Sequence, residues 1–420
     1  MRIRLYNAKI LSMKEETIER GELWVEDGVI EYIGKEKVSE KEFEREIDLH
    51  ENLVMPGFKN AHAHSPMTFA RSYADGLPLD KWLNEKIFPM EAKLTDKHVY
   101  YYSKLAYMEY LSSGITAAFD MYYEPEAMIQ ASVESGFRTV LCGAVNNFKE
   151  SVEILEGYFK EYNQRHDLIS YILGFHAEYT TDLDMMKKIG RLAEKYKSPV
   201  FVHNSETWKE VENCKKKYGM TPTQLFKECG MYEYGGGGFH CLYLSEEDIE
   251  IFKEKQLYAV LNVCSNLKLA SGFVPANKYQ KAGMKLALGT DGPSSNNALD
   301  MFREMYILNV LQKVIEQDAV ALSAFDTLKM ATVYGAEAMG LKDCDVLEKG
   351  KKADLIVIDL QTPNMQPENN LFYHLVYSAG KQNVYMTMID GKILYENGEY
   401  KTIDAEEIYF FANKLLKELY

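Results

Sequence analysis

The sequence predicts an α/β fold, a (β/α)8 TIM barrel joined to a small β-sandwich domain that both chain termini build. Three observations support this prediction. Eight short apolar runs alternate with helical patterns between about residues 53 and 292, as the strands and helices of an eight-fold barrel would. Both chain ends instead alternate polar and apolar residues, which is typical of antiparallel strands. No Gly-x-Gly-x-x-Gly turn or P-loop follows the first run, which disfavours the alternative of a doubly wound open sheet.

The predicted barrel strands are rich in Val, Ile, Leu, Phe and Ala, as strands buried on both faces are. Clear helical patterns, with apolar residues at i, i+3 and i+4, cover residues 96–113, 184–196, 246–255 and 299–316. The eight strands are expected at residues 53–58, 115–120, 138–145, 171–176, 199–203, 238–242, 258–263 and 285–290.

The two chain ends are predicted to pair into one β-domain, because each end alone has too few strands to be stable. Alternating segments lie at residues 2–12, 21–33, 352–358 and 384–400, and turn signals such as Asp390-Gly391 separate them. We therefore expect three units. They are a composite β-domain of residues 1–52 and 345–404, a barrel of residues 53–344, and a C-terminal amphipathic helix of residues 405–420.

Four consecutive glycines, residues 235–238, stand at the start of the sixth predicted strand. A glycine-rich run can cradle a phosphate. This one leads into a strand, which places it at the amino-terminal face of the barrel, away from the face where barrel enzymes keep their active sites. We therefore expect a flexible loop and no phosphate site.

The composition describes a globular protein, with 46% hydrophobic and 26% charged residues. Its 48 Lys and Arg against 63 Asp and Glu leave a net charge of −15, which repels phosphate backbones and anionic membranes and argues against both as partners. No stretch approaches the ~20 apolar residues of a membrane helix, and no secretory signal is present, so we expect a cytoplasmic protein. The six cysteines form no C-x-x-C pair, which predicts reduced, buried thiols.

Histidines gather where the predicted strands end, and this is the carboxyl-terminal face that carries chemistry in barrels. Side chains alternate along a strand, so residues i and i+2 point the same way, roughly 7 Å apart. A His-x-His sequence after the first strand can therefore direct two imidazoles at one ion. The strand-end residues are His62, His64, His176, His203 with Glu206 beyond it, His240 and Asp291.

The His-x-His pair, the histidine that ends the fifth strand and the aspartate after the eighth strand together supply three imidazoles and one carboxylate. Such a set suits Zn or Fe(II), with an open position for water. No cysteine joins the set, so a thiolate site is excluded. A metal held in this way lowers the pKa of its water from about 15.7 to about 7. The pattern therefore predicts hydrolytic chemistry.

Several motifs carry a resemblance that covers nearly the whole chain. Together they resemble the amidohydrolase superfamily and, more narrowly, its 5′-methylthioadenosine/S-adenosylhomocysteine deaminase branch, including the archaeal 5′-deoxyadenosine deaminases. His-x-His alone marks the superfamily, whereas the two longest motifs are more specific. The motifs are His62-Ala-His64, His203-Asn-Ser-Glu206, Ser265-Asn-Leu-Lys-Leu-Ala-Ser-Gly272 and Gly289-Thr-Asp-Gly-Pro-Ser-Ser-Asn-Asn297.

The resemblance implies a role for each matched position. One divalent metal ion per subunit, Zn first and Fe(II) second, is implied on His62, His64, His203 and Asp291. Glu91 would grip the ribose hydroxyls, His176 and Glu206 would meet the purine, and Ser295 would lie near the imidazole side of the base. His240 would sit beside the attacking water. No lysine ends the fourth strand, which disfavours a two-metal centre.

The expected activity is hydrolytic deamination of adenine nucleosides that carry small 5′ groups, giving the inosine analogue and ammonia. Glu206 would carry a proton between water, N1 and the leaving amine, while Asp291 accepts the water's first proton and also faces the substrate. No arginine follows the third strand before Lys149, so an amino-acid tail lacks a bidentate partner and small apolar groups are favoured. Trp82 is a candidate to pack on such a group.

Candidate substrates are 5′-deoxyadenosine and 5′-methylthioadenosine, then S-adenosylhomocysteine and adenosine, which suggests salvage of S-adenosylmethionine by-products. The resemblance also implies a homo-oligomer, a dimer or tetramer. Two alternatives stay open at this point: another amidohydrolase reaction, on a free base or a cyclic amide, and a non-catalytic metal-binding barrel. Zinc chemistry of the cytidine-deaminase type is excluded, because it needs a C-x-x-C motif.

Overall fold

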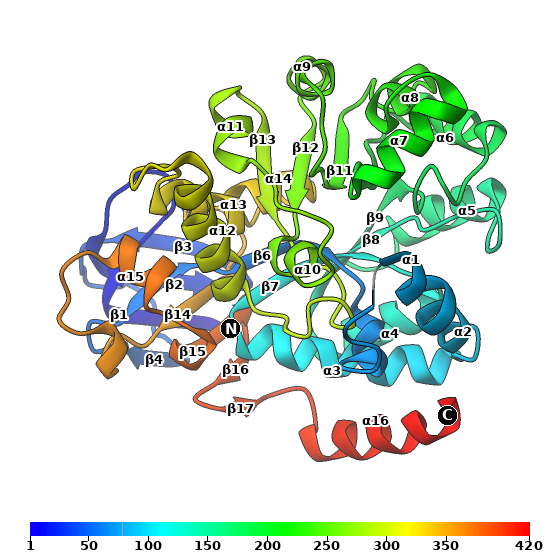
Figure 1. Ribbon diagram of the computed structural model, residues 1–420. Coiled ribbons are helices and arrows are strands. Elements are labelled where there is room, and N and C mark those ends of the chain that lie inside the picture. The colour runs from blue at the N-terminus through cyan, green and yellow to red at the C-terminus, as the bar shows by residue number, and fades with distance from the viewer. Residues whose placement is uncertain (78) are drawn as a thin grey trace.

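Figure 1 shows the computed structural model, which describes residues 1–77 and 79–420. Eight parallel strands form a barrel in sequence order, and helices cover its outer face. The predicted barrel is thereby confirmed. Its strands are β6 (Phe58–Ala63), β7 (Ile115–Met121), β8 (Arg138–Cys142), β9 (Ile169–Gly174), β10 (Val200–Asn204), β11 (Gly236–His240), β12 (Tyr258–Leu261) and β13 (Lys285–Leu288).

The barrel closes between β13 and β6. The Asp291 amide donates to the His62 carbonyl at 3.0 Å. Asn60 and Thr290 form a reciprocal pair. The side-chain amide of Asn60 donates to the Thr290 hydroxyl at 2.7 Å, and the backbone amide of Thr290 donates to Asn60 Oδ1 at 2.8 Å. The seam therefore holds the residues that follow β13 against those at the end of β6.

The first barrel strand differs from the prediction of residues 53–58, which was wrong. The apolar run there is divided: β5 (Leu53–Pro56) pairs with β1 and β14 of the second sheet, and the barrel strand β6 begins at Phe58. Gly57 lies between β5 and β6, where the chain passes from the second sheet into the barrel. Only glycine fits at this position, because a Cβ there would lie 2.1 Å from the Thr116 side chain. The other seven barrel strands overlap their predicted ranges.

The glycine run is also not the flexible loop that we expected. Gly236, Gly237 and Gly238 belong to β11, and a Cβ on Gly236 or Gly237 would lie 2.1 or 2.0 Å from a carbonyl oxygen of the adjacent strand. Neighbouring backbones approach too closely for any side chain. The run is therefore a close-packed strand of the barrel.

The predicted helices are present, and most begin at a polar cap. Thr95 caps α3 (Asp96–Ser112), Asp182 caps α6 (Leu183–Tyr196) and Ser245 caps α9 (Glu246–Glu254). None of the helices in the described part of the chain is long and apolar enough to cross a membrane. Further helices are α4 (Pro125–Ser135), α5 (Val152–Tyr162), α7 (Trp208–Tyr218), α8 (Pro222–Glu228), α10 (Val263–Lys268), α11 (Ala276–Lys281), α12 (Met301–Glu316), α13 (Ala324–Ala331), α14 (Val333–Ala338) and α15 (Leu371–Tyr377).

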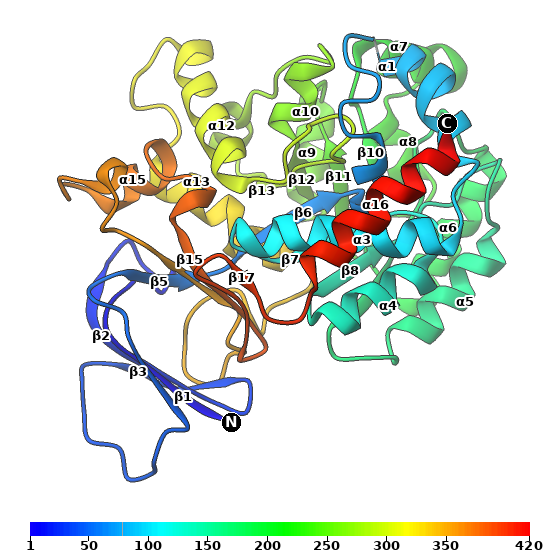
Figure 2. The ribbon, with the colours of Figure 1, turned by 90° about the horizontal axis from the view of Figure 1, so that it is seen from below.

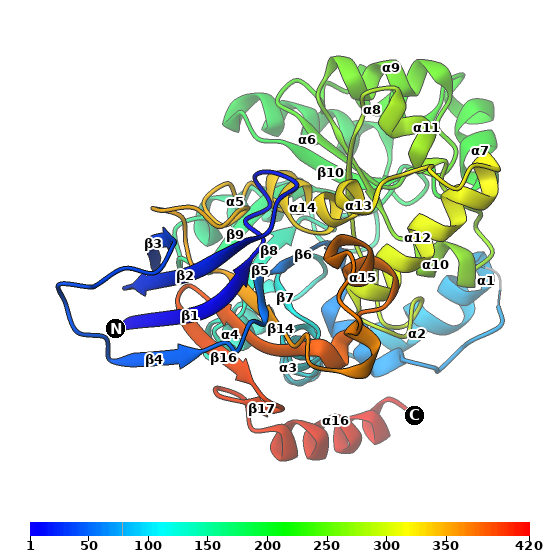
Figure 3. The same ribbon diagram turned by 90° about the vertical axis from the view of Figure 1, so that its left-hand side faces the viewer.

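The two chain ends build one nine-stranded sheet, which Figure 3 shows from its own side. Residues of six strands share one core, and the β2–β3 turn at Gly28 lies against the β15–β16 turn at Asp390, so the sheet curls on itself. The predicted sandwich is therefore one curled sheet. Its order is β17-β16-β15-β14-β5-β1-β2-β3 with β4 on β1: β1 (Arg2–Ile10), β2 (Glu19–Glu26), β3 (Val29–Gly34), β4 (Arg45–Asp48), β14 (Leu355–Ile358), β15 (Val384–Ile389), β16 (Lys392–Glu396) and β17 (Glu399–Tyr400).

Barrel and sheet are joined by a buried ion pair. Arg138 at the start of β8 donates twice to the Asp354 carboxylate, at 2.7 and 3.0 Å. The C-terminal helix α16 (Ala405–Leu419) lies along α3 (Figure 2), where the Tyr102 hydroxyl donates to the Ala412 carbonyl at 3.2 Å. The exact limits of the three predicted units stay a prediction.

Candidate active site

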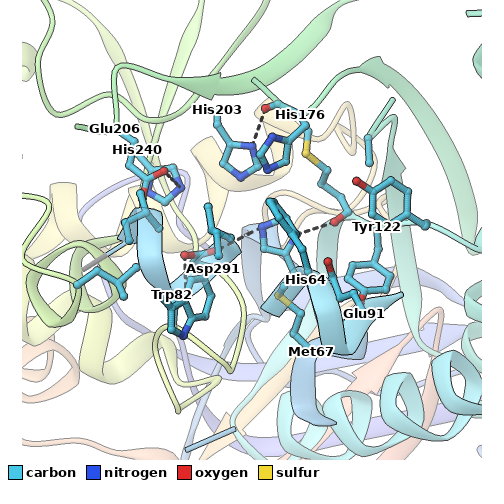
Figure 4. Close-up of a pocket in the computed structure, with 18 of the residues that line it drawn as sticks. His64, Met67, Trp82, Glu91, Tyr122, His176, His203, Glu206, His240 and Asp291 are labelled. Atoms are coloured by element: carbon cyan, nitrogen blue, oxygen red, sulfur yellow. Dashed lines mark hydrogen bonds and ion pairs between the residues drawn. The ribbon is translucent and has the colours of Figure 1, made fainter. Parts of the chain in front are cut away.

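The predicted site residues converge on one cavity at the carboxyl ends of the barrel strands (Figure 4). His62 is the exception, since it lies fully buried beneath the cavity. The other nine line it: His64, Trp82, Glu91, His176, His203, Glu206, His240, Asp291 and Ser295.

The His-x-His pair lies at the end of β6, with ring centroids 4.7 Å apart. His64 Nδ1 donates to the Met121 carbonyl at 2.6 Å, which turns its Nε2 toward Asp291, whose Oδ1 lies 3.3 Å away; this Nε2 is the atom that could coordinate an ion in place of its contact with the carboxylate. Both ring nitrogens of His62 are buried without a hydrogen-bond partner. An unpartnered buried imidazole is costly, and binding of a cation would satisfy it.

Asp291 is oriented by two serines. Its Oδ2 accepts hydrogen bonds from the hydroxyls of Ser265 at 2.6 Å and Ser295 at 2.8 Å. Oδ1 is left facing the two histidines of β6. Burial by itself would raise the pKa of Asp291, but the hydrogen bond to His64 and the nearby histidines hold it well below the ordinary value. The carboxylate is therefore ionised, as a metal ligand must be.

His203 and His240 lie close together but differ in which ring nitrogen carries the proton. His203 Nδ1 donates to the His176 carbonyl at 2.7 Å, which leaves a lone pair on Nε2. His240 Nδ1 instead accepts from the Asn266 side-chain amide at 2.8 Å, which puts the proton on Nε2. That Nε2 lies 3.9 Å from a Glu206 oxygen. His203 thus has the tautomer of a ligand, and His240 that of a hydrogen-bond donor.

The donor atoms fit a divalent cation. Two overlapping groups bring them within 4.8 Å of one another: His62, His64 and Asp291, and His62, His203 and His240. Burial holds the pKa of His62 and of His203 well below the ordinary value, so both rings are neutral and able to coordinate a metal. His240 differs from these ligand candidates, because its Nε2 carries a proton and so cannot coordinate a metal.

Glu206 follows β10 and is almost fully buried. Burial, together with the charges of Asp291 and Glu210, raises its pKa well above the ordinary value. Glu206 can therefore hold a proton at neutral pH and release it, as acid–base work requires. Ser205 beside it and His240 and Asp291 across from it have φ of 53°, 73° and 60°, so left-handed backbone concentrates at the site.

A second acid holds the loop that carries Glu206. The Glu210 carboxylate accepts the backbone amides of Ser205 at 2.7 Å, Glu206 at 2.8 Å and Thr207 at 3.3 Å. Glu178, 3% exposed, lies beside it. Burial and the neighbouring Glu210 raise the pKa of Glu178 to about 9, so at neutral pH this pair retains a proton.

Glu91 lies across the cavity from Glu206 (Figure 4). It ends the short helix α2 (Phe88–Glu91), and burial raises its pKa while the nearby Tyr122 hydroxyl opposes the rise. Trp82, at the start of the π-helical turn Trp82–Ile87, is buried and also lines the cavity. His176 Nδ1 lies 2.9 Å from the Thr180 hydroxyl. The cavity thus has an acid at each end and the histidine cluster at its floor.

Sequence reasoning missed several contributors. Tyr122 and Tyr123 line the cavity directly after β7, and a search of all residues that follow strands would have found them. Asn266 lies inside a recognised motif, yet its contact with His240 depends on two strands meeting. Phe88 and Met67 carry no signal beyond being apolar.

Comparison with known proteins decides the family. A family model described as the amidohydrolase family matches residues 53–394. The chain belongs to the amidohydrolase family. This family is metal-dependent, in agreement with a histidine–aspartate cluster that could hold an ion.

Relatives of this amidohydrolase align along its whole length. It is 38% identical, over 100% of its own chain and 99% of the relative, to the 5-methylthioadenosine/S-adenosylhomocysteine deaminase of Caldanaerobacter subterraneus. A crystal structure of an adenosine deaminase from Xanthomonas campestris with bound zinc is 30% identical, with a TM-score of 0.93 over 100% and 98% of the two chains. Atrazine chlorohydrolase from Arthrobacter aurescens, 19% identical with a TM-score of 0.91 over 99% and 100%, shares the fold alone.

Proposed function

We propose that this amidohydrolase is a metal-dependent hydrolytic deaminase of adenine nucleosides, with 5′-deoxyadenosine and 5′-methylthioadenosine as first candidates, ahead of S-adenosylhomocysteine and adenosine. Water adds at C6, ammonia leaves and the inosine analogue remains. The observation that carries the proposal is the pair of buried acids, Glu91 and Glu206, on opposite sides of a cavity floored by the histidine cluster. Such a cavity suits a ligand with hydroxyls at one end and a protonatable ring at the other. The names of its relatives, a 5-methylthioadenosine/S-adenosylhomocysteine deaminase and an adenosine deaminase, support adenine nucleosides as the substrate class, whereas 5′-deoxyadenosine as a candidate comes from the resemblance alone.

His62, His64, His203 and Asp291 would hold one divalent ion, and the three imidazoles with one carboxylate favour Zn, with Fe(II) second. When bound, the ion supplies a nucleophilic water at neutral pH. His64 and His203 are oriented for this role by the carbonyls that accept their Nδ1 protons, and Asp291 by its two serines.

The protein's own groups would then manage protons. Glu206, whose pKa is raised by burial, would donate its proton to N1 of the adenine, take up the remaining hydroxyl proton of the added water and pass it to the leaving amine; the proton first accepted by Asp291 then restores the protonated Glu206. Asp291 accepts the first proton of the attacking water. The Nε2 proton of His240 is directed toward the same space and can donate to the attacking oxygen. Glu91 would hold the ribose, Trp82 and His176 would pack on the nucleoside, and Ser295 would face the base.

Conversion of 5′-deoxyadenosine by metal-replete protein tests the proposal. Absorbance near the adenine band should fall while ammonia is released in equal amount. Glu206→Gln should keep its metal, measured by elemental analysis, and lose about 100-fold or more in kcat. Absence of conversion by the metal-replete wild type would overturn the proposal. Turnover that survives in Glu206→Gln would overturn the role of this residue.

Glu91 separates nucleoside deamination from the two alternatives. If the ribose is held by Glu91, then Glu91→Ala should raise KM for nucleosides about tenfold or more and leave any activity on free adenine unchanged. Glu85→Ala, on the preceding turn and exposed, is the matched control. Equal losses on base and nucleoside would favour a free-base or cyclic-amide reaction, and absence of turnover with metal bound would favour a non-catalytic barrel.

A further inference from the structure

Glu304, on α12, is a buried acid behind the active site. It is completely buried and does not line the active-site cavity. Its Oε2 accepts the backbone amide of Cys264 at 3.1 Å, and its Oε1 accepts the side-chain amide of Asn296 at 2.7 Å. Cys264 follows β12 and Asn296 follows β13, which are neighbouring barrel strands. One carboxylate therefore connects the loops that follow these two strands.

The contact with Cys264 holds the start of α10, which packs against α12 (Figure 1). Cys264 lies in the first turn of this helix, where backbone amides need an acceptor from outside the helix. Asn262, the residue before the helix, makes no capping hydrogen bond, and both polar atoms of its side chain are buried without a partner. Glu304 thus supplies an acceptor that the cap residue does not.

The loop after β12 carries two groups that orient reactive residues. Ser265 and Asn266 directly follow Cys264. The Ser265 hydroxyl donates to Asp291 Oδ2 at 2.6 Å, and the Asn266 side-chain amide donates to His240 Nδ1 at 2.8 Å. The place of the Cys264 amide therefore sets where both of these donors begin.

The loop after β13 carries Asp291 itself and its second hydroxyl donor. Ser295 donates to Asp291 Oδ2 at 2.8 Å and directly precedes Asn296. The Asn296 side-chain amide donates to the Thr290 carbonyl at 2.7 Å as well as to Glu304. Both serines that hold Asp291 thus lie next to a residue that Glu304 binds.

Packing alone does not explain an acid at this position. An apolar side chain would fill the same space without the desolvation of a carboxylate. Each oxygen of Glu304 instead accepts one N–H in a defined direction, which fixes the two loops relative to each other. The geometry points to orientation of the loops as the role of the carboxylate.

We propose that Glu304 is a positioning residue, which aligns the Asp291 carboxylate and the His240 ring through the two loops that it connects. It belongs neither to the cavity lining nor to the groups that could hold a metal ion. This inference rests on the proposed function and adds a further layer of contacts behind its reactive groups. Since Asp291 would bind the metal and accept a proton, misalignment lowers both metal affinity and kcat, whereas the contacts that bind the nucleoside are unchanged.

Glu304→Gln tests the proposal, because it keeps the shape of the side chain and replaces one accepting oxygen with an NH2 group. This group would face an N–H, so one of the two loops is released. With saturating Zn²⁺, we expect kcat for 5′-deoxyadenosine to fall about tenfold and KM to change by less than about twofold. The dissociation constant for Zn²⁺, measured by competition with a chromophoric chelator, should rise about tenfold.

Asp248→Asn is the matched control. Asp248, on α9, is also completely buried, and its carboxylate accepts the Thr221 hydroxyl at 2.5 Å and the Ser245 backbone amide at 2.8 Å. None of these three residues lines the active-site cavity. Asp248→Asn should lower the free energy of unfolding by an amount similar to Glu304→Gln, and leave kcat and Zn²⁺ affinity unchanged.

A second variant keeps the proposal testable if Glu304→Gln does not fold. Asn296→Ala removes one of the two contacts and leaves Glu304 in place, so kcat and Zn²⁺ affinity should each fall about threefold, as loss of one hydrogen bond predicts. Unchanged kcat and Zn²⁺ affinity in the folded variants would overturn the proposal. Equal losses in Asp248→Asn would also overturn it, because the effect would then be one of general stability. If the wild type binds Zn²⁺ but deaminates no adenine nucleoside, the proposed function fails, and the Zn²⁺ affinities still test Glu304.

Discussion

Single atoms decide the chemistry of this site. His203 and His240 are both buried strand-end histidines with rings 5.4 Å apart, yet a carbonyl on one and a side-chain amide on the other direct their protons to opposite nitrogens. The two carboxylate oxygens of Asp291 also have different partners: Oδ2 accepts hydrogen bonds from two serines, and Oδ1 faces the histidines of β6. These outer contacts orient the groups that would meet the metal and the water.

Asn266 offers a direct test of the His240 tautomer. An aspartate there would accept rather than donate, so Asn266→Asp should move the His240 proton from Nε2 to Nδ1. We expect kcat to fall about 100-fold or more with metal content and KM nearly unchanged. Asn266→Ala, which imposes no tautomer, should lose less. Equal losses in the two variants, measured by steady-state kinetics and elemental analysis, would contradict this account.

Glu178 predicts a pH-dependent stability. Burial raises its pKa in the folded protein from 4.5 to about 9. The stability linked to this proton is fully present below pH 4.5 and is lost progressively as the pH rises through about 9. Glu178→Gln stays neutral and should remove this loss. Between pH 5.5 and 8.5, the wild-type free energy of unfolding in urea should fall by about 1 kcal/mol or more relative to the variant, and parallel curves would disprove the effect.

At the scale of elements, β11 shows how closely the barrel strands are packed. Its glycines leave room for the carbonyl oxygens of Val200 and Tyr258, which a side chain would displace. The strand ends at His240, so this packing also positions a residue of the site. The element is short, and its sequence is set by what its neighbours allow.

Gly237→Ala tests this packing. A Cβ at this position would lie 2.0 Å from the Tyr258 carbonyl oxygen, so the barrel backbone must shift. We expect the free energy of unfolding to fall by about 1–3 kcal/mol. Gly157→Ala is the matched control, because nothing lies within 4 Å of its Cβ position in α5, and it should be neutral or slightly stabilising. A Gly237→Ala protein as stable as the control would show that the strand is not tightly packed.

The whole molecule depends on the contact between barrel and curled sheet. The sheet draws strands from both end regions of the chain, so its assembly brings these two regions together on one side of the barrel, whereas α16 carries the C-terminus away from the sheet (Figure 3). The ion pair of Arg138 with Asp354 lies at this junction, and the Asp390 amide donates to the same carboxylate at 2.8 Å. The dimer or tetramer implied by the resemblance stays a prediction for light scattering.

Arg138→Leu should lower the free energy of unfolding, because it breaks the ion pair between the barrel and the curled sheet. It leaves the Asp354 charge buried without its cation, which costs about 3–5 kcal/mol. Adding Asp354→Asn removes that charge and should recover much of the loss, while a double variant as unstable as the single one would contradict the argument. In the wild type, Arg138 overcomes burial and lowers the pKa of Asp354. The stability that the ionised Asp354 carboxylate contributes is therefore present above the ordinary Asp pKa of 3.8. It is lost as the pH falls through the lower pKa that Asp354 has in the folded protein.

Much of the candidate site was predictable from the sequence, because its residues are tied to local patterns. A histidine or acid at the end of an apolar run is at a strand end, and eight parallel strands bring all such ends to one face. This rule predicts from the sequence alone that His62, His64, His203, Glu206 and Asp291 gather at one face of the barrel. Membership of the amidohydrolase family was likewise carried by short motifs.

Other features of the fold and the site depend on contacts between segments that are distant in the sequence, and the local sequence pattern does not predict those contacts. The apolar run at residues 53–58 has no periodicity that would assign its first half to one sheet and its end to another. The glycines of β11 look like a loop until the adjacent carbonyls are known. The position of the His240 proton depends on Asn266, which follows a neighbouring strand and reaches His240 only in the folded barrel. The sequence by itself determined most of the barrel strands, the family and the reactive groups, whereas the tertiary structure decided where the first barrel strand begins and how the reactive groups are oriented, because both depend on contacts between distant residues.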